Sequence, residues 1–366
     1  MTYPNVSTLP SSRLRATPRR WVFSALLGGL VLAFILSLTL GSVNIPLPQI
    51  ITILFGGLPD VPAWGQIIWL FRLPRALTAM LAGAALSVAG VQMQTLFRNP
   101  LADPFVLGIS AGASLGVALL VMGGQLAIRS GVGATLLSGL DAPTGLTAVL
   151  AASLGALGVM LLVLAVAQRV NVMTLLVLGL MIGYAVSALV SILLHFSAPE
   201  QIQVYIAWTF GSFSGTTWED LKVLLPVVLV GVGLAQFSAK PLNALLLGET
   251  YAVSMGLSLG RTRLVILLGA SLLAGAITAF CGPIGFLGVA VPHLARLLLN
   301  AADHRRLLPA SVLLGALVAL LADLLAQVPG SAIVLPLNAI TALVGAPVVT
   351  WVILSQRNLR EAFGSA

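Results

Sequence analysis

The stretch RLPRALTAMLAGAALSVAGVQMQTLF, residues 72–97, gives the clearest evidence of the fold. After Arg75 it runs to Phe97 without a charged side chain and consists mostly of Ala, Leu, Val, Gly and Met. A helix needs about 20 predominantly apolar residues to cross a hydrocarbon core of about 30 Å. The stretch therefore predicts a helix that spans a membrane.

Similar stretches occur along the whole chain. Apolar windows of spanning length cover residues 21–41, 76–97, 104–123, 145–167, 173–196, 221–237, 264–281, 307–328 and 334–355. A tenth candidate, Leu287–Leu299, is shorter and contains Pro292, His293 and Arg296, so its hydropathy leaves open whether it spans. The sequence thus predicts an all-α membrane protein with nine or ten spans.

The positions of the basic residues decide between nine and ten spans. If nine spans are drawn with the N-terminus in the cytoplasm, the 18 Lys and Arg divide equally between the two sides. If ten are drawn, 14 of the 18 lie on the cytoplasmic side and 4 lie outside. Because cytoplasmic loops carry the excess of Lys and Arg, we expect ten spans with both termini in the cytoplasm.

The composition excludes a water-soluble fold. Hydrophobic residues make up 59% of the chain and charged residues only 8%, whereas soluble domains have about 25% charged residues. The formal net charge is +8, but the basic residues lie between the spans and are interpreted as topology signals. We therefore expect a lipid bilayer as partner and no nucleic acid. The single Cys281 excludes an internal disulfide.

The chain is interpreted as one membrane domain with two tails. Residues 1–20 form a basic cytoplasmic tail, residues 21–355 the transmembrane domain and residues 356–366 a cytoplasmic C-terminal tail. The apolar run that begins at Trp21 is too long for the core of a cleaved signal peptide. It is therefore predicted to be the first span.

Two further patterns concern how the spans pack. Gly108, Gly112 and Gly116 recur at four-residue spacing, which predicts close contact between helices. The stretches LAGAAL at 81–86 and LGASLL at 268–273 resemble each other, and each is followed by a connection broken by proline. They run in opposite directions across the membrane in the ten-span topology, which suggests a possible inverted repeat.

The loop KPLNALLLGETYAVSMGLSLGRTR, residues 240–263, is too polar to span. Its apolar residues group at helical periodicity into stripes on two short helices that are broken near Gly248. Apolar stripes on a cytoplasmic loop need either a protein partner or the lipid headgroups to cover them.

The sequence lacks the residues that several kinds of chemistry require. The chain has no phosphate-binding loop of the form G-x-x-x-x-G-K-[ST], so ATP would have to be hydrolysed by another chain. The three histidines are scattered, which predicts neither a metal site nor a catalytic residue or cofactor. Asp323 is the only carboxylate inside a span, and it supports an alternative hypothesis of a secondary transporter driven by an ion gradient. A membrane enzyme would need clustered polar residues at one depth, and the sequence has no such cluster.

Three stretches together resemble one family. They are Arg72–Gly112 with its RLPR and RNPLADP motifs, the loop LNALLLGETYAVSMGLSLG at 242–260, and GPIGFLGVAVPHLAR at 282–296 followed by DHRRLLP at 303–309. The combination is similar to the FecCD-type permeases of ABC importers for iron-siderophores, haem and cobalamin, and the resemblance extends over residues 20–355. It implies a fold like that of the cobalamin importer permease.

The resemblance also implies partners and cargo. We expect two ATPase subunits, an extracytoplasmic substrate-binding protein and a second permease copy, identical or closely related, in the bacterial cytoplasmic membrane. The permease itself would perform no covalent chemistry. A ferric siderophore is the first expectation for cargo, followed by haem and cobalamin.

Arg72 and Arg75 are the residues expected to dock the binding protein. They lie at the outer mouth of a span, where the positive-inside rule disfavours them, so an acidic partner or anchoring at the headgroups must account for them. In the resembling family, arginines of this motif pair with glutamates of the binding protein, and a guanidinium can bind a carboxylate with two hydrogen bonds. A further family arginine is replaced here by Gln327.

The resemblance assigns two more sets of residues. The residues expected to couple to the ATPase are Leu246, Gly248, Glu249, Ala252 and Leu257. The cytoplasmic gate is expected at Asn171 and Val172, where many family members have small hydroxyl residues. Val334 and Asn338 depart from the family's Glu-Leu-Pro-Val-Gly pattern and suggest a different subfamily or ligand.

Overall fold

The computed structural model describes residues 20–129, 145–167, 169–328, 330 and 333–355. The predicted C-terminal tail and, apart from Arg20, the predicted N-terminal tail lie outside these residues. Within them every regular element is a helix, which confirms the predicted fold class. The longer helices are α1 (Arg20–Thr39), α4 (Leu73–Leu96), α5 (Ile109–Arg129), α7 (Gly145–Ala167), α8 (Val172–His195), α10 (Trp218–Phe237), α13 (Leu259–Cys281), α14 (Leu287–Leu299), α15 (His304–Ala326) and α16 (Leu337–Ser355).

Nine of these helices correspond to the windows predicted from hydropathy, and α14 corresponds to the tenth candidate, which the charge asymmetry favoured. Among the described residues, seven helical stretches are long and apolar enough to cross a membrane, and α5, α14 and α16 contribute shorter apolar stretches. Short helices connect them: α2 (Leu47–Leu54), α3 (Pro62–Gln66), the π-helix η1 (Ile67–Arg72), the 3₁₀-helix η2 (Pro104–Leu107), α9 (Pro199–Thr209), α11 (Ala239–Leu246) and α12 (Glu249–Ser254).

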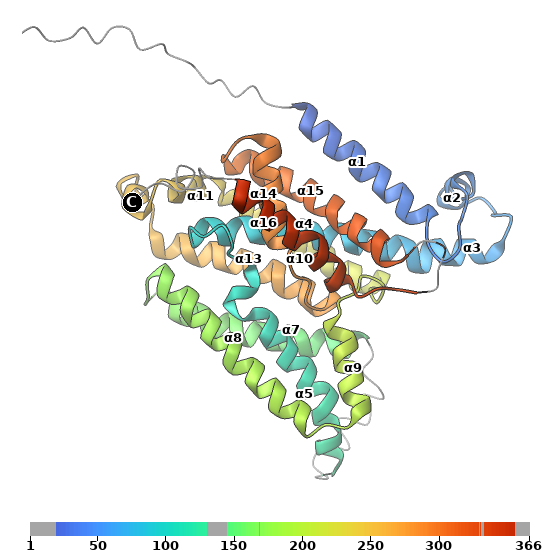
Figure 1. Cartoon of the computed structure of the whole chain (residues 1–366), viewed down its shortest axis with the longest axis horizontal. Coiled ribbons are helices and arrows are strands. Elements are labelled where there is room, and N and C mark those ends of the chain that lie inside the picture. Colours follow the sequence, from blue (N-terminus) through green and yellow to red (C-terminus); the bar gives the residue numbers. More distant parts are fainter. Residues whose placement is uncertain (1–19, 130–144, 168, 329, 331–332, 356–366) are drawn as a thin grey trace, which may run out of the picture.

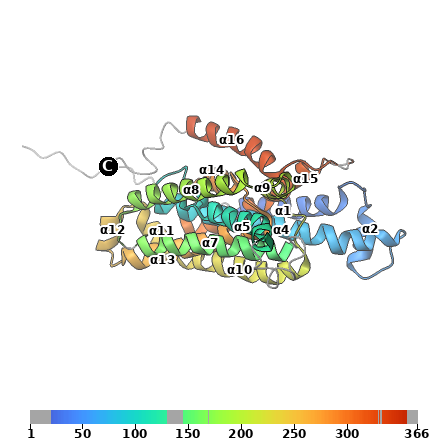
Figure 2. The same ribbon diagram turned by 90° about the horizontal axis from the view of Figure 1, so that it is seen from below.

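The bundle has two distinct ends and a central helix. Helices α2 and α3 lie at one end and α11 and α12 at the opposite end, as both ribbon views show (Figures 1 and 2). We call them the α2 end and the α11 end. Helix α4 runs between them through the middle of the bundle, and most of its residues are buried. Helix α16 lies on one face of the bundle (Figure 2).

Glycines let α4 approach its neighbours closely. A Cβ atom on Gly83 would lie 2.0 Å from the carbonyl oxygen of Gly315 in α15, and one on Gly90 would lie 1.8 Å from that of Gly288 in α14. Real Cβ atoms do not come this close, so only glycine fits at these crossings. The core is therefore held by direct contact between helix backbones.

The predicted glycine packing is confirmed around α5. Gly112 and Gly116 face Gly155 and Ala151 of α7, and a Cβ on Gly116 would lie 2.0 Å from the carbonyl oxygen of Ala151. Gly108, with a φ of +77°, packs against Gly179 and Gly183 of α8. The possible inverted repeat stays a prediction, although α4 and α13 pack against each other and each precedes a connection containing proline.

A π-helical turn leads into α4. Pro74 has no backbone N–H, so it cannot complete an α-helical bond to the carbonyl four residues earlier. The backbone N–H of Leu73 instead bonds the carbonyl of Ile68, five residues earlier. The wider turn leaves Ile68 fully buried in a small apolar cluster at the α2 end. This turn also carries Arg72, the first of the predicted docking residues.

Candidate functional site

Arg72 is buried against the end of α1. Its guanidinium donates hydrogen bonds to the backbone carbonyls of Leu38 (2.5 Å), Thr39 (3.1 Å) and Val43. These carbonyls belong to the last turn of α1 and the loop after it, which leave acceptors without helical partners. Arg72 therefore fastens the ends of α1 and α4 to each other at the α2 end.

Arg75, one turn further along α4, forms an ion pair with Asp323 of α15. Its Nε lies 2.9 and 3.0 Å from the two carboxylate oxygens, and its Nη2 donates to Oδ1 at 2.8 Å. The amide of Gln327 donates a further hydrogen bond to Oδ2 at 2.8 Å. Asp323 is buried, while the Arg75 side chain keeps 16% of its surface exposed.

This ion pair bears on two expectations. The sequence argument required an acidic partner for arginines at this end, and Asp323 provides one for Arg75 within the chain. Asp323 also holds three side-chain hydrogen-bond donors, an arrangement that favours a fixed carboxylate over one that exchanges an ion. Arg75 and Asp323 are 248 residues apart, and the only sequence signal for their pairing was one acid and one base at the same predicted depth.

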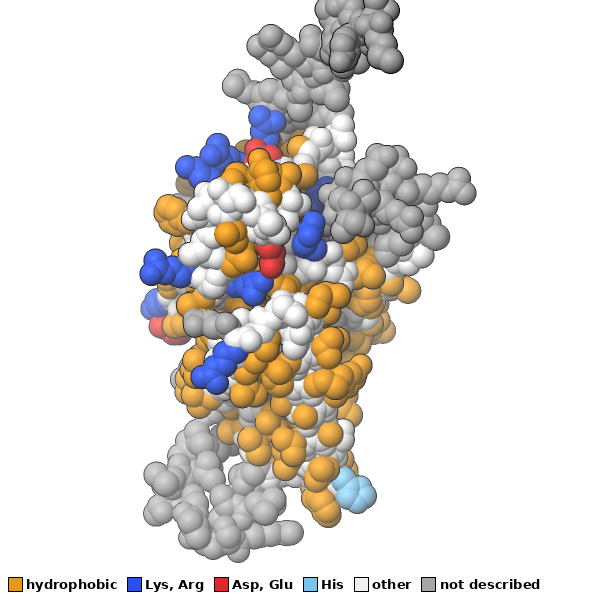
Figure 3. Space-filling model, turned by 90° about the vertical axis from the view of Figure 1, so that its left-hand side faces the viewer, with side chains coloured by type: hydrophobic (Ala, Val, Ile, Leu, Met, Phe, Trp, Pro, Cys, Tyr) orange, Lys and Arg blue, Asp and Glu red, His pale blue; other side chains and the backbone are white. Residues whose placement is uncertain are grey.

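The α11 end exposes apolar side chains beside basic ones (Figure 3). Leu247, Tyr251, Val253 and Met255 are each at least half exposed. We call these four residues the α11–α12 surface. The fully buried Ala252 lies between Tyr251 and Val253, and exposed polar residues such as Thr250 and Ser254 lie among the four apolar side chains.

The predicted coupling residues lie mainly behind this surface. Ala252 is fully buried, Leu246 is half-buried and Leu257 packs against the core. Gly248 separates α11 from α12 as expected, and its φ of +109° is a conformation that favours glycine. The structure confirms the predicted break near Gly248, and the coupling role of these residues stays a prediction.

Glu249 connects α12 to the segment before α8. Its carboxylate accepts a hydrogen bond of 2.7 Å from the Arg263 guanidinium, which also lies 3.4 Å from the carbonyl of Val170. The expected gate begins at the next residue, Asn171, whose side chain caps α8 by accepting a 2.7 Å hydrogen bond from the Thr174 N–H. The structure therefore brings one predicted coupling residue close to the predicted gate.

A hollow of about 360 Å³ lies beside the α11–α12 surface. It is lined by Lys240, Asn243, Ala244, Leu247, Met255, Asp303 and Arg305. Partial burial would raise the pKa of Asp303, but hydrogen bonds from Asn243 and the Arg305 N–H, with the charges of Arg305 and Arg306, lower it. Asp303 is therefore held as a carboxylate in a basic setting.

The elbow after α4 is tied to α14. The ring of His293 forms a 2.8 Å hydrogen bond with the carbonyl of Pro100. Asp103 caps η2 by accepting a 2.8 Å hydrogen bond from the Phe105 N–H. Burial raises the pKa of Asp103 to about 6, against the opposing effect of that bond. The elbow is thus fixed by contacts within the chain.

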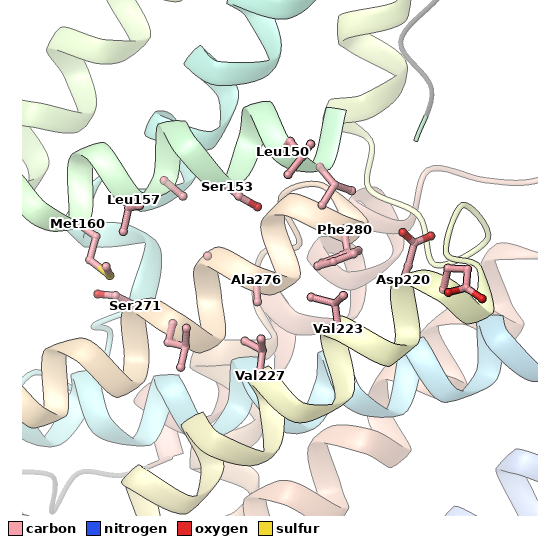
Figure 4. Close-up of a pocket in the computed structure, with 15 residues that line it drawn as sticks. Leu150, Ser153, Leu157, Met160, Asp220, Val223, Val227, Ser271, Ala276 and Phe280 are labelled. Carbon is pink, nitrogen blue, oxygen red and sulfur yellow. The ribbon is translucent and has the colours of Figure 1, made fainter. Parts of the chain in front are cut away.

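A second cavity, of about 410 Å³, lies between α7, α10 and α13 (Figure 4). Its lining is mostly apolar, with the hydroxyls of Ser153 and Ser271 on facing walls. At one end Glu219 pairs with Lys222 at 2.6 Å, and Asp220 accepts two hydrogen bonds from Thr217. The lining therefore suits an apolar group better than a charged one.

Within the described part of the chain, no three His, Cys, Asp or Glu side chains come together as metal ligands. Asn338, which departs from the family pattern, accepts a 2.9 Å hydrogen bond from the Gly285 N–H. This bond fixes the start of α16 to the loop that precedes α14, so the departure has a structural role.

Comparison with known proteins defines the family. A sequence model of the FecCD transport family matches residues 29–355. The chain belongs to the FecCD transport family. It is 37% identical over 334 residues to the uncharacterized ABC transporter permease protein YvrB of Bacillus subtilis (strain 168), covering 89% of this chain and 91% of YvrB.

Two other relatives agree. The chain is 35% identical over 341 residues to the vitamin B12 import system permease protein BtuC of Klebsiella pneumoniae, covering 93% of this chain and 95% of BtuC. A solved structure described as "an inward-facing conformation of a putative metal-chelate type ABC transporter" superposes with a TM-score of 0.77 at 30% identity. The superposition covers 92% of this chain and 99% of that one.

The chain is therefore a multi-pass permease subunit of a type II ABC importer, with the all-helical BtuC-like fold. ATP hydrolysis belongs to a separate protein, as the missing phosphate loop indicated. This assignment takes the place of the hypothesis of an ion-driven transporter that uses Asp323.

Proposed function

We propose that this permease moves a large organic metal chelate, namely a ferric siderophore, haem or cobalamin, inward across the bacterial cytoplasmic membrane. The names of BtuC and of the structural relative support this class of cargo. A ferric siderophore is our first choice. The observation that carries the mechanism is the exposed apolar α11–α12 surface beside basic side chains.

The charge distribution supports an orientation with the α11 end in the cytoplasm. Basic residues at this end are Arg98, Arg169, Lys240, Arg261, Arg263, Arg296, Arg305 and Arg306. Among the described residues, the opposite side has only Arg72, Arg75, Lys222 and Arg129, the last residue of α5. Since cytoplasmic loops are enriched in Lys and Arg, both termini would then lie in the cytoplasm.

The α11–α12 surface is the proposed contact with the ATPase. An exposed surface of Leu, Tyr, Val and Met side chains resembles the core of a protein interface, and a basic rim complements an acidic partner. Leu246, Gly248, Glu249, Ala252 and Leu257 support this surface from behind. Two ATPase subunits would engage a dimer of permeases, one on each copy.

Movement of α12 would reach the cytoplasmic gate by a short route. Glu249 holds Arg263, and Arg263 contacts the backbone just before Asn171 and Val172. ATP binding would displace α12 and with it the start of α8, which opens or closes the pathway between the two permease copies.

The α2 end would face the extracytoplasmic binding protein, with docking near Arg72 and Arg75. Because the Arg75 charge is offset by Asp323 and Gln327 replaces a family arginine, the free positive charge available at this end is small. The binding protein would therefore rely more on shape and hydrogen bonds than on ion pairs.

Reconstituted uptake tests this function. The full chain, its ATPase and its binding protein are placed in proteoliposomes and offered radiolabelled ferric hydroxamate siderophore, haem and cobalamin in turn. We expect ATP-dependent uptake of one ligand that requires all three components. Uptake driven by a proton gradient without the ATPase would contradict the proposal.

A further inference from the structure

A continuous chain of polar side chains runs from α11 to the last turn of α4. The Asn243 amide oxygen on α11 accepts hydrogen bonds from the backbone N–H (2.9 Å) and the ring Nδ1 (2.7 Å) of His304. The Asn243 amide nitrogen donates to Asp303 at 2.7 Å. On its other side, the His304 Nε2 lies 2.8 Å from the hydroxyl oxygen of Thr95 on α4.

The geometry fixes the direction of the bonds that Asn243 makes. A backbone N–H can only donate, so the Asn243 oxygen faces His304 and its nitrogen faces the Asp303 carboxylate. The His304 Nδ1 must then carry the proton that it donates to Asn243. In the neutral ring Nε2 is an acceptor for the Thr95 hydroxyl. The same hydroxyl lies 2.8 Å from the backbone carbonyl of Val91 in its own helix, so its single proton is shared between His304 and Val91.

Burial makes this chain stiff. Thr95 and His304 are each 1% exposed, and Leu242 and Leu307 beside them are fully buried. Hydrogen bonds in such a medium are strong and directional, and breaking one leaves a polar group without water to replace its partner. Apolar contacts can slide past each other, whereas these bonds hold α11, the start of α15 and α4 in one register.

The neighbouring residue of α4 extends the connection to α14. The Gln94 amide oxygen accepts a 2.6 Å hydrogen bond from Arg296, and its nitrogen lies 3.3 Å from the carbonyl of Val289. One turn of α4 therefore joins two polar assemblies, one from α11 and α15 and one from α14.

We infer that Asn243, His304 and Thr95 are positioning residues that make α11 and the cytoplasmic end of α4 move as one body when the ATPase acts. The inference rests on the proposed function, because it needs the ATPase to displace α11. It adds a second route, to the central helix, beside the Glu249–Arg263 route to α8.

The most direct variant is Thr95→Val, which keeps the shape of the side chain and removes the hydroxyl. Thr95→Ser restores the hydroxyl and should restore function. Thr78→Val is the matched control, because Thr78 is also buried on α4 and its hydroxyl bonds only the carbonyl of Pro74 in the same helix.

Movement is measured by electron paramagnetic resonance. Spin labels are attached at Lys240 on α11 and at exposed Leu101 in the elbow after α4, in a Cys281→Ala background. The labelled chain is diluted with unlabelled copies, so that only distances within one chain are recorded. The complex with its ATPase is compared before and after addition of ATP and vanadate.

We expect the distance to stay unchanged on nucleotide addition in the original chain, in Thr95→Ser and in Thr78→Val. In Thr95→Val the distance should shift or broaden, with the ATPase still bound at the same ratio. A shift in the original chain, or no shift in Thr95→Val, would overturn the inference. Failure of the original chain to retain an ATPase would contradict the proposed function itself and would be seen before any distance is measured.

Discussion

The two ends of the bundle use charge in opposite ways. At the α2 end, Arg72 and Arg75 are satisfied by backbone carbonyls of the α1 end and by Asp323. At the α11 end, Lys240 and Arg305 line an open hollow beside exposed apolar side chains. The first arrangement holds helices together, and the second is available to another protein.

The difference shows why an arginine in a motif need not be a free binding residue. A guanidinium that is placed in a helix bundle finds acceptors wherever helices end, because their last carbonyls lack partners. Arg72 occupies such a position. The basic side chains at the two ends differ in their exposure and pairing rather than in residue type.

Asp323→Ala, at the α2 end, should lower the unfolding free energy and have the largest effect of these variants. It leaves the Arg75 charge in a mostly buried place without its carboxylate, which costs about 3–5 kcal/mol of unfolding free energy. The measurement is the midpoint of thermal unfolding of the purified protein in detergent.

The double variant Arg75→Met with Asp323→Leu is its control. Replacing both charges by apolar groups of similar size should recover most of the lost stability. If Asp323→Ala alone unfolds at the original temperature, the ion pair does not hold α4 to α15.

Leu247→Glu, at the α11 end, should weaken binding of the ATPase without affecting the fold. Leu247 is 63% exposed, so a carboxylate there remains hydrated but is buried unfavourably when a partner binds. We expect affinity for the ATPase to fall at least tenfold, equivalent to about 1.4 kcal/mol, as measured by titration of the purified subunits. Leu58→Glu, on the exposed loop at the α2 end, should leave the affinity unchanged, and an equal loss in both variants would contradict the comparison.

Gln92→Leu, in the middle of the bundle between the two ends, should stabilise the protein. Among the described residues, neither amide atom of Gln92 has a hydrogen-bond partner, although the side chain is fully buried on α4. Removing it should raise the unfolding free energy by about 1–2 kcal/mol. Gln94→Leu, close by at the α11 end, should instead lower stability because Arg296 loses its acceptor. Thermal unfolding distinguishes the two signs, and destabilisation by Gln92→Leu would contradict this account.

Asp303→Asn should have the smallest effect and a defined dependence on pH. Because the pKa of Asp303 is lowered on folding, its stabilising contribution is present above the ordinary pKa near 4 and is lost as pH falls through the lowered value. The variant should lose less than about 1 kcal/mol at pH 7. The difference in unfolding midpoint between pH 7 and pH 3 should be smaller in the variant, and a larger difference would contradict the assigned sign.

The sequence predicted the helices well because hydropathy is a local property. Each of the nine windows required only the residues within it, and the position of Gly248 marked the break between α11 and α12. Charge asymmetry then decided that the short stretch Leu287–Leu299 belonged with the spans. The family motifs gave the class of transporter.

Contacts between distant residues were beyond the sequence. The pairing of Arg75 with Asp323 depends on which helices are neighbours, and no local pattern specifies that. The same holds for Asn243, whose amide is one polar residue in a loop until α15 places His304 against it. Periodicity also could not separate Leu246 from the exposed Leu247, because two helices this short fit more than one outward face.

The most direct test of the account is photo-crosslinking of the ATPase to single sites at the two ends. A photoreactive label is attached at Met255 or at Leu58, both exposed, in the Cys281→Ala background. After illumination of the assembled complex in membrane vesicles, the account predicts crosslinked ATPase from Met255 and none from Leu58. Crosslinking of the ATPase from Leu58, or no crosslinking from Met255, would contradict the division of roles between the two ends.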